Sequence, residues 1–339
     1  MKPIIFAPHD PRALKISGTK QILMGLVLAA VFMASHRILA AGPAPVDLGS
    51  AAPFTIFAAT KITTTGGGVI NGNVGLSPNT GAAIGIPAAQ VNGTIYEVDA
   101  TGPAGAVIAP ALLTAAKGDL TTAYNDAAGR TPVPTGTNFL NPGAGNIGGM
   151  NLVPGLYKFT GTASITGSDL TLTGGPNDVW IFQCGADLQV GDAVQVILAG
   201  GAQARNIFWQ VGTSAVIGTT AAFEGTIMAD QAITMNTGST MNGRALASNA
   251  AVTYNGDNGA LSTPSAPIFT GISRTTTNAT VVLNSSPYFL VTLQSSPGLS
   301  LHWMIIATNN PVTNIWTFTD TNATATATQR FYRAFITMP

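Results

Sequence analysis

A short repeat in residues 206–258 limits what this chain can fold into. Segment 215–225 aligns with 233–243 at an offset of 18 residues, and segment 250–255 matches 231–236 at an offset of 19. β-Branched residues alternate with small ones there, and Gly or Asn stands at the expected corners, which is typical of strands of about five residues joined by tight bends. Repeats this short cannot each bury a core, so they stack and share one. The sequence therefore predicts a parallel β-helix with three short faces per coil.

The composition indicates a folded chain with an unusually uncharged surface. Hydrophobic residues make up 46% and charged residues 8%, where about 25% charged is usual. Residues 1–40 hold five of the 14 basic and one of the 14 acidic side chains, which leaves 9 basic and 13 acidic, a net charge of −4. Because no basic stripe remains to neutralise phosphates, nucleic acid is not expected as a partner.

The first 41 residues have the pattern of a secretory signal peptide. Lys15 and Lys20 precede an apolar run at 22–34, and small residues follow at 40–42. The run is short for a membrane span. We therefore expect residues 1–41 to be a signal peptide and the protein to be secreted, or associated with the cell surface. Arg37 directly after His36 is unusual for such a leader, and leaves an uncleaved anchor as the alternative.

Residues 109–128 break the strand pattern. Apolar residues recur there at three- and four-residue intervals, the period of one amphipathic helix, and Gly129 is placed to end it. We expect this helix to lie along the solenoid and to cover one of its faces.

A second, smaller β domain is predicted beyond the solenoid. The solenoid is expected over residues 42–262, and a proline-rich linker over 263–267. Strands spaced about a dozen residues apart in 268–339 suggest a small β-sandwich. Its architecture resembles that of fibronectin-type-III-like modules of secreted bacterial proteins. We expect it to act as a spacer, or to attach the protein to the cell envelope.

Six motifs occur in order over residues 46–258. They are the segments 72–78 (GNVGLSP), 119–129 (DLTTAYNDAAG), 152–157 (LVPGLY), 180–183 (WIFQ), 206–212 (NIFWQVG) and 242–247 (NGRALA). Together they resemble the β-helical ice-binding protein family of cold-adapted bacteria, yeasts and diatoms. The resemblance implies a right-handed β-helix whose coils are not in sequence order, with one α-helix packed alongside. It further implies a protein that binds an ice surface through a flat face and inhibits ice growth or recrystallisation.

Physical reasoning supports an ice-binding face independently. Stacked coils place strands about 4.8 Å apart and alternate residues of a strand about 6.7 Å apart. A rigid grid of small hydroxyl, methyl and glycine positions can hold water in a lattice like that of ice. Charged groups organise water differently, and residues 206–258 carry few of them.

Some members of the resembling family carry a Thr-Ala/Gly-X-Thr/Asn pattern on the ice face. Segment 237–240 matches it fully, segment 219–222 lies beneath in the repeat and matches partly, and segment 166–169 is a third partial match. We therefore predict one strand row as the ice face, with the row through Thr213, Ser214 and Gln231 as its alternative. The predicted ice-binding residues are Thr219, Thr220, Ala222, Thr237, Gly238, Ser239, Thr240, Thr166 and Ser168.

Catalysis is not indicated. β-Helix enzymes need clustered carboxylates or a Ca²⁺ site; on the repeat coils Glu224 and Asp230 are the one pair that could meet, and a solvated role is favoured for both. We expect no catalytic residue, cofactor, metal or small-molecule substrate, and a monomer. The alternative function is a cell-surface or matrix adhesin, a structural solenoid that binds a polysaccharide or other cells.

Overall fold

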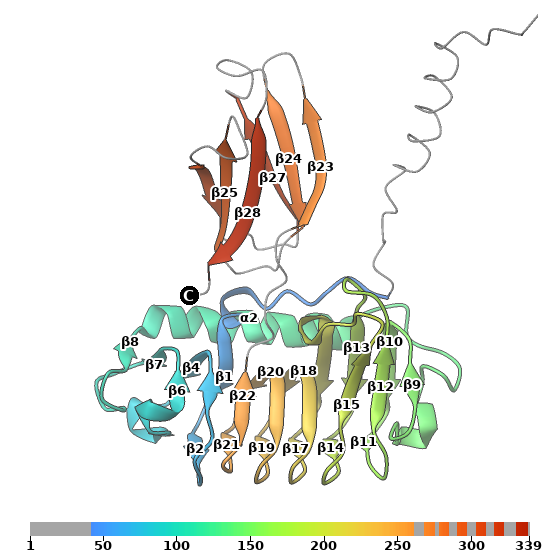
Figure 1. Ribbon diagram of the computed structural model, residues 1–339. Coiled ribbons are helices and arrows are strands. Elements are labelled where there is room, and N and C mark those ends of the chain that lie inside the picture. Colours follow the sequence, from blue (N-terminus) through green and yellow to red (C-terminus); the bar gives the residue numbers. More distant parts are fainter. Residues whose placement is uncertain are drawn as a thin grey trace, which may run out of the picture. The chain divides into compact units, whose positions relative to one another are not determined.

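The computed structural model describes residues 42–260, 268–274, 278–284, 290–296, 303–309, 315–321 and 330–337. The predicted signal peptide at 1–41 and the linker at 263–267 lie outside the described residues. Residues 42–260 form a parallel β-helix with one α-helix, α2 (Pro110–Gly129), along its side (Figure 1). The predicted fold class is confirmed for this region.

Each coil contributes strands to three faces. The helix-side face consists of β10 (Gly155–Phe159), β13 (Trp180–Cys184), β16 (Ile207–Val211), β18 (Ala222–Ala229), β20 (Thr240–Ala247), β1 (Phe54–Ala58), β4 (Asn73–Leu76), β7 (Ile95–Glu97) and β8 (Val107–Ile108). The seven-stranded face consists of β11 (Ala163–Ile165), β14 (Leu188–Val190), β17 (Ala215–Ile217), β19 (Ile233–Met235), β21 (Val252–Tyr254), β2 (Ile62–Thr64) and β5 (Ile84–Gly85).

The third face is less regular. It consists of β9 (Asn151–Leu152), β12 (Leu170–Thr173), β15 (Val196–Ala199), β22 (Asn258–Ala260), β3 (Ile70–Asn71) and β6 (Val91–Asn92), together with the first residues of β18 and β20. Short 3-10 helices interrupt the coils at η1 (Gly49–Ala51), η2 (Gly81–Ala83), η3 (Ala88–Gln90), η4 (Pro142–Gly145) and η5 (Ala204–Asn206).

The coils do not stack in sequence order, as the family resemblance implied. β1 lies between β20 and β4, and Ile56 is paired with Ala245. The first strand thus lies in the middle of the stack; from there the chain runs to β8 at one end and resumes at β10 at the other. Helix α2, which contacts both β7 and β13, makes the return. Its 20 residues rise about 30 Å, and the six strand spacings from β7 to β13 span about 29 Å.

The interior of the β-helix is filled by side chains that point inward in register. In five strands of the seven-stranded face, β11, β14, β17, β19 and β21, the two outer residues are buried and the middle one points out. Four aromatic rings follow one another along the axis, those of Tyr157, Phe182, Trp209 and Phe223, with successive centroids 5.2, 3.8 and 5.3 Å apart. Stacked rings and aliphatic rows give a dry core that holds the coils rigid.

Helix α2 covers the helix-side face. The side chains of Leu113, Ala116, Leu120, Ala123 and Ala127 are buried at the predicted helical spacing. They pack against outward side chains of the sheet: Phe54, Phe57, Ile181, Phe208, Met228 and Leu246. This face is therefore closed to an external surface.

The C-terminal residues form two three-stranded antiparallel sheets. One has the order β23 (Ile268–Arg274), β24 (Ala279–Asn284), β27 (Ile315–Asp320), and the other the order β26 (Met304–Asn309), β25 (Leu290–Ser296), β28 (Phe331–Thr337). Val281 and Leu283 of one sheet share a core with Val291 and Leu293 of the other. The pairing is that of a small β-sandwich, as predicted. Among the described residues, no helix is long and apolar enough to cross a membrane.

Candidate functional site

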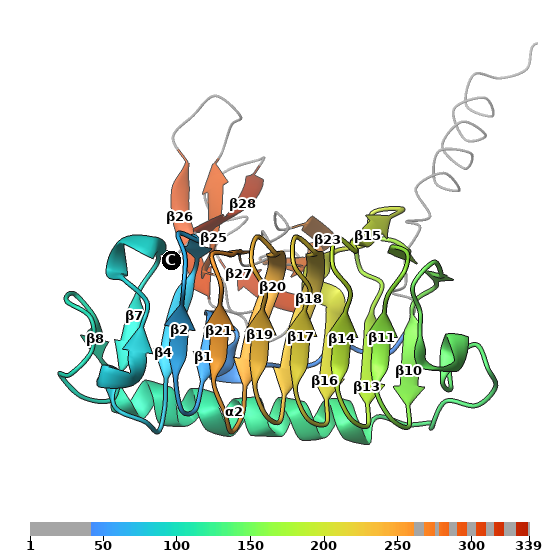
Figure 2. The same cartoon turned by 90° about the horizontal axis from the view of Figure 1, so that it is seen from below.

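The seven-stranded face presents one ordered row of exposed and half-buried residues. Figure 2 looks onto this face and shows β11, β14, β17, β19, β21 and β2 side by side. The strands are paired in parallel without a register shift, so the middle residue of each lies beside that of the next. This central row reads Ser164, Gln189, Val216, Thr234, Thr253 and Thr63, and ends at Gly85.

The central row is uncharged. Threonines occupy three consecutive positions in it, and the hydroxyl oxygens of Thr63 and Thr253 are 3.3 Å apart. The residues directly before the strands are also mostly small, with Asp187 and Lys61 as the charged members of that flanking row. The Asp187 carboxylate is held at the surface, because it accepts hydrogen bonds from the Thr213 hydroxyl and the Ser214 amide.

The third face is chemically mixed. Its outward residues include the half-buried Glu224, whose carboxylate accepts a hydrogen bond of 2.9 Å from the Asn242 side chain. Ile197, on the same face, is 40% exposed. Burial raises the pKa of Glu224 to about 7, although the Asn242 hydrogen bond acts in the opposite direction. A bulky hydrocarbon and an ionisable group side by side do not form a uniform lattice of small groups.

Most of the predicted ice-binding residues lie in turns rather than on a strand. Thr219 and Thr220 join β17 to β18, Thr237 and Gly238 join β19 to β20, and all four are exposed. The predicted stacking is confirmed, because the Thr220 amide donates to the Thr237 carbonyl at 3.0 Å. The predicted strand row is wrong, since the backbone turns here with Thr220 at φ 57° and Gly238 at φ 75°.

Thr166 and Ser168 occupy the corresponding turn between β11 and β12, and both are exposed. The six turn residues thus form a border between the seven-stranded face and the third face. The contact of these residues with ice stays a prediction.

The remaining three predicted residues separate from this border. Ala222 and Thr240 are neighbours in register, as the 18-residue offset predicted, but they point outward on the third face. Ser239 is fully buried, so its side chain cannot contact an external surface. The alternative row through Thr213 and Gln231 lies along the opposite border of the seven-stranded face.

The central row has a sequence signal of its own, which the predicted ice-binding residues do not include. In Ala215-Val216-Ile217, Ile233-Thr234-Met235 and Val252-Thr253-Tyr254, one residue stands between two apolar ones in every coil. Alternation of this kind marks the outward position of a half-buried strand. The Thr-Ala/Gly-X-Thr/Asn pattern lies mainly at the corner between two faces, so it does not mark the central row.

The carboxylates do not assemble into a catalytic pair. Glu224 is bonded to Asn242 on the third face. Asp230 lies at a corner, where it accepts hydrogen bonds from the side chains of Gln231 and Asn249. In the described part of the chain, no group of three His, Cys, Asp or Glu side chains is arranged to hold a metal ion.

The family match lies within the β-helix. Residues 56–258 match the family described as ice-binding-like. An ice-binding protein from a Colwellia species is 43% identical over 236 residues, which are 69% of this chain and 90% of the relative. One from Flavobacterium frigoris is 48% identical over 205 residues, 60% of this chain and 72% of the relative.

Solved structures agree with the sequence matches. An ice-binding protein from an Antarctic biological consortium has 38% sequence identity and a TM-score of 0.56, and the similarity covers 66% of this chain and 95% of that protein. An ice-binding protein from an Arctic yeast, described with a structural basis for antifreeze activity, has 35% identity and a TM-score of 0.59, with 65% and 94% covered.

Proposed function

This chain belongs to the ice-binding-like family, and we propose on that basis that it adsorbs to ice and inhibits ice growth or recrystallisation. The observation that carries the proposal is the seven-stranded face, a repeated surface on a rigid core whose central row carries no charge and holds threonine at three consecutive positions. Its central row repeats at the strand spacing of about 4.8 Å, and the flanking positions stand about 6.7 Å away along each strand. The function is adsorption, and no chemical step is part of it.

The proposed ice-contact surface is the central row together with the border turns. Two of the three faces are less suited to ice. The helix-side face is covered by α2, and the third face carries Glu224 and Ile197. The turn residues Thr219, Thr220, Thr237 and Gly238 would extend the surface along one border, and Thr166 and Ser168 would extend it at the first coil.

Three tyrosine substitutions distinguish the faces. Thr253→Tyr places a bulky ring in the centre of the seven-stranded face, Thr220→Tyr places one in the border turn, and Thr240→Tyr places one on the third face. We expect Thr253→Tyr to abolish partition of the purified protein into slowly growing ice, and Thr220→Tyr to weaken it. We expect Thr240→Tyr to adsorb like the parent.

The melting temperatures should stay close to that of the parent, because exposed substitutions usually change stability by less than about 0.5 kcal/mol. Normal adsorption by Thr253→Tyr together with loss in Thr240→Tyr would assign the ice contact to the third face. Normal adsorption by all three variants would show that ice contacts neither the seven-stranded face with its border turns nor the third face.

We further infer that the protein is exported and acts as a monomer. Export is supported by the leader pattern in residues 1–41, and the monomer by a face whose proposed partner is ice rather than another protein. N-terminal sequencing of protein recovered from the culture medium tests the first point: a mature chain that starts near residue 41 is expected. Light scattering during gel filtration tests the second.

A further inference from the structure

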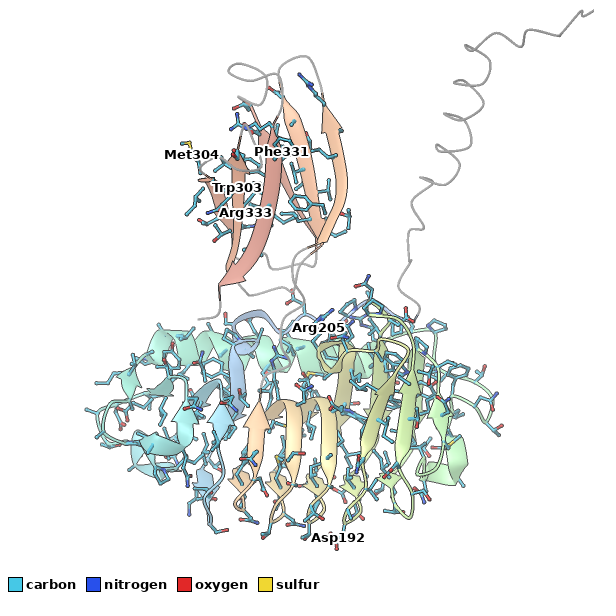
Figure 3. All side chains as sticks on the ribbon, viewed as in Figure 1. Asp192, Arg205, Trp303, Met304, Phe331 and Arg333 are labelled. Carbon is cyan, nitrogen blue, oxygen red and sulfur yellow. The ribbon has the colours of Figure 1, made fainter. Side chains whose placement is uncertain are left out.

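A cluster of planar side chains lies on the outer surface of the sheet β26–β25–β28 in the C-terminal module. Gln294 of β25 is paired with Arg333 of β28 on one side and with Ile305 of β26 on the other. Trp303, just before β26, lies beneath the guanidinium group of Arg333 (Figure 3). We call Trp303, Gln294, Arg333 and Ile305 the platform.

Two contacts hold the Arg333 guanidinium in place. Its Cζ atom lies 4.4 Å from the centroid of the Trp303 ring, and its Nε atom donates a hydrogen bond of 2.7 Å to Oε1 of Gln294. The residue is nevertheless exposed. An arginine fixed in this way loses little conformational freedom when a ligand binds to its terminal amino groups.

The C-terminal module holds little negative charge that could pair with Arg333. Residues 268–339 contain three arginines, one aspartate and neither lysine nor glutamate. That aspartate, Asp320, is bonded at 3.0 Å to Arg330 and at 3.0 Å to the Tyr332 hydroxyl. The module has a net charge of +2, whereas residues 42–262, with 6 basic and 12 acidic side chains, have −6. The positive charge is therefore particular to the module.

The surroundings of Arg333 are apolar. Ile305, which is 62% exposed, lies on the same face because it is paired with Gln294. The other sheet of the sandwich differs, since threonines such as Thr280, Thr317 and Thr319 point outward there. Exposed hydrocarbon beside a fixed cation and an amide can contact the apolar ring atoms, the hydroxyls and the carboxylate of an acidic sugar, while the Trp303 ring holds the cation in place.

We propose that the platform binds an acidic polysaccharide whose sugars carry carboxylates, with one carboxylate held by the terminal amino groups of Arg333. A planar carboxylate matches the guanidinium fork in a bidentate manner. An extended peptide is less suited, because β25 is paired on both sides and offers no free backbone edge at Gln294. The proposal does not depend on ice binding by the β-helix.

Retention of the full-length protein on immobilised polygalacturonate, compared with neutral dextran at about 0.15 M salt, tests the proposal. We expect retention on polygalacturonate alone. Arg333→Gln should weaken it by about tenfold or more, the usual effect of losing a hydrogen-bonded charge pair, and Arg333→Lys should restore it only in part. Arg274→Gln removes an exposed arginine of the other sheet and should change retention by less than about twofold.

A second variant keeps Arg333 in place. Gln294→Glu offers the guanidinium a carboxylate within its own sheet, and should abolish retention while leaving the melting temperature and ice adsorption unchanged. Equal retention of the parent on polygalacturonate and dextran would overturn the proposal. A loss of retention in Arg274→Gln as large as that in Arg333→Gln would also overturn it. Equal binding to dextran sulfate with the same dependence on Arg333 would overturn the preference for carboxylates.

Discussion

Glu224 shows how position in a coil changes the chemistry of a single residue. Its carboxyl group is half-buried on the third face, and burial raises its pKa to about 7 from the ordinary 4.5. Below about pH 4.5 the group is protonated in both the folded and the unfolded state. Between about pH 4.5 and 7 the unfolded state loses the proton first, so the free energy of unfolding falls as the pH rises and levels off above about pH 7.

Glu224→Gln should remove the part of the pH dependence of stability that comes from this carboxyl group. The amide oxygen can still accept the hydrogen bond from Asn242, and no charge is buried at high pH. We expect the variant to be more stable than the parent above about pH 7, with the difference shrinking towards pH 4.5. Urea denaturation across this range measures it. Parallel stability curves for variant and parent would contradict the assignment.

At the residue scale the sequence predicted which residues of neighbouring coils lie beside each other. It did not predict whether a residue lies on a strand or at a corner. The 18-residue offset places Thr240 above Ala222, and the structure has that pair in register. It could not show which part of a coil is a corner, because Thr220 adopts a left-handed conformation with φ 57° that is uncommon outside glycine, asparagine and aspartate. Ser239 is buried in the corresponding turn of the next coil, between β19 and β20, and no local sequence pattern predicts this burial.

The end of α2 illustrates how one element is fixed by another. Gln183 of β13 is buried, and its side-chain amide donates to the carbonyl oxygens of Ala127 at 2.8 Å and Ala128 at 3.1 Å. These carbonyls belong to the last helical turn, which lacks partners within the helix. The sheet thus supplies the C-terminal cap of the helix that covers it.

Gln183→Leu should leave those two carbonyls unsatisfied. We expect a loss of about 1–3 kcal/mol in stability, and faster amide hydrogen exchange in the last turn of α2 than in its middle. Gln189→Leu is the matched control, because Gln189 lies in β14, the next strand along the chain, with an exposed side chain. Equal losses in the two variants would show that the cap contributes nothing.

At the element scale, the periodicity of the sequence was sufficient to predict the helix, but the shortest strands could not be predicted. The helix was predicted within one residue at each end, since five buried apolar residues recur on one side of it. Strands such as β3, β5 and β6 have two residues each, too few for an alternating pattern to be visible. Their positions are set by pairing with neighbouring coils rather than by their own sequence.

For the whole molecule we predict that the β-helix binds ice without the C-terminal module. The β-helix has its own core, and the sandwich is built around a separate cluster of Val281, Leu283, Val291 and Leu293. A protein that ends at Ala260 should fold and partition into ice like the full chain. A truncated protein with an unchanged melting transition that stays in the liquid would contradict this. The full chain with Arg333→Gln is a control that retains the module.

The order of the coils came from the family resemblance, and physical reasoning alone would not have given it. Repeats stack because they share a core, but stacking energy does not specify that β1 follows β20. The fit between the length of α2 and the span from β7 to β13 is a geometric condition that only the assembled chain displays.

Because of that fit, the length of α2 limits how many coils the β-helix can have, and so limits the length of the seven-stranded face. One additional coil would lengthen the stack by about 4.8 Å, which corresponds to about three helical residues. A longer stack with an unchanged helix would leave part of the helix-side sheet without cover, and a longer helix with unchanged coils would extend past the end of the stack. An additional coil and a longer α2 are therefore expected to occur together, although they are encoded in separate parts of the gene.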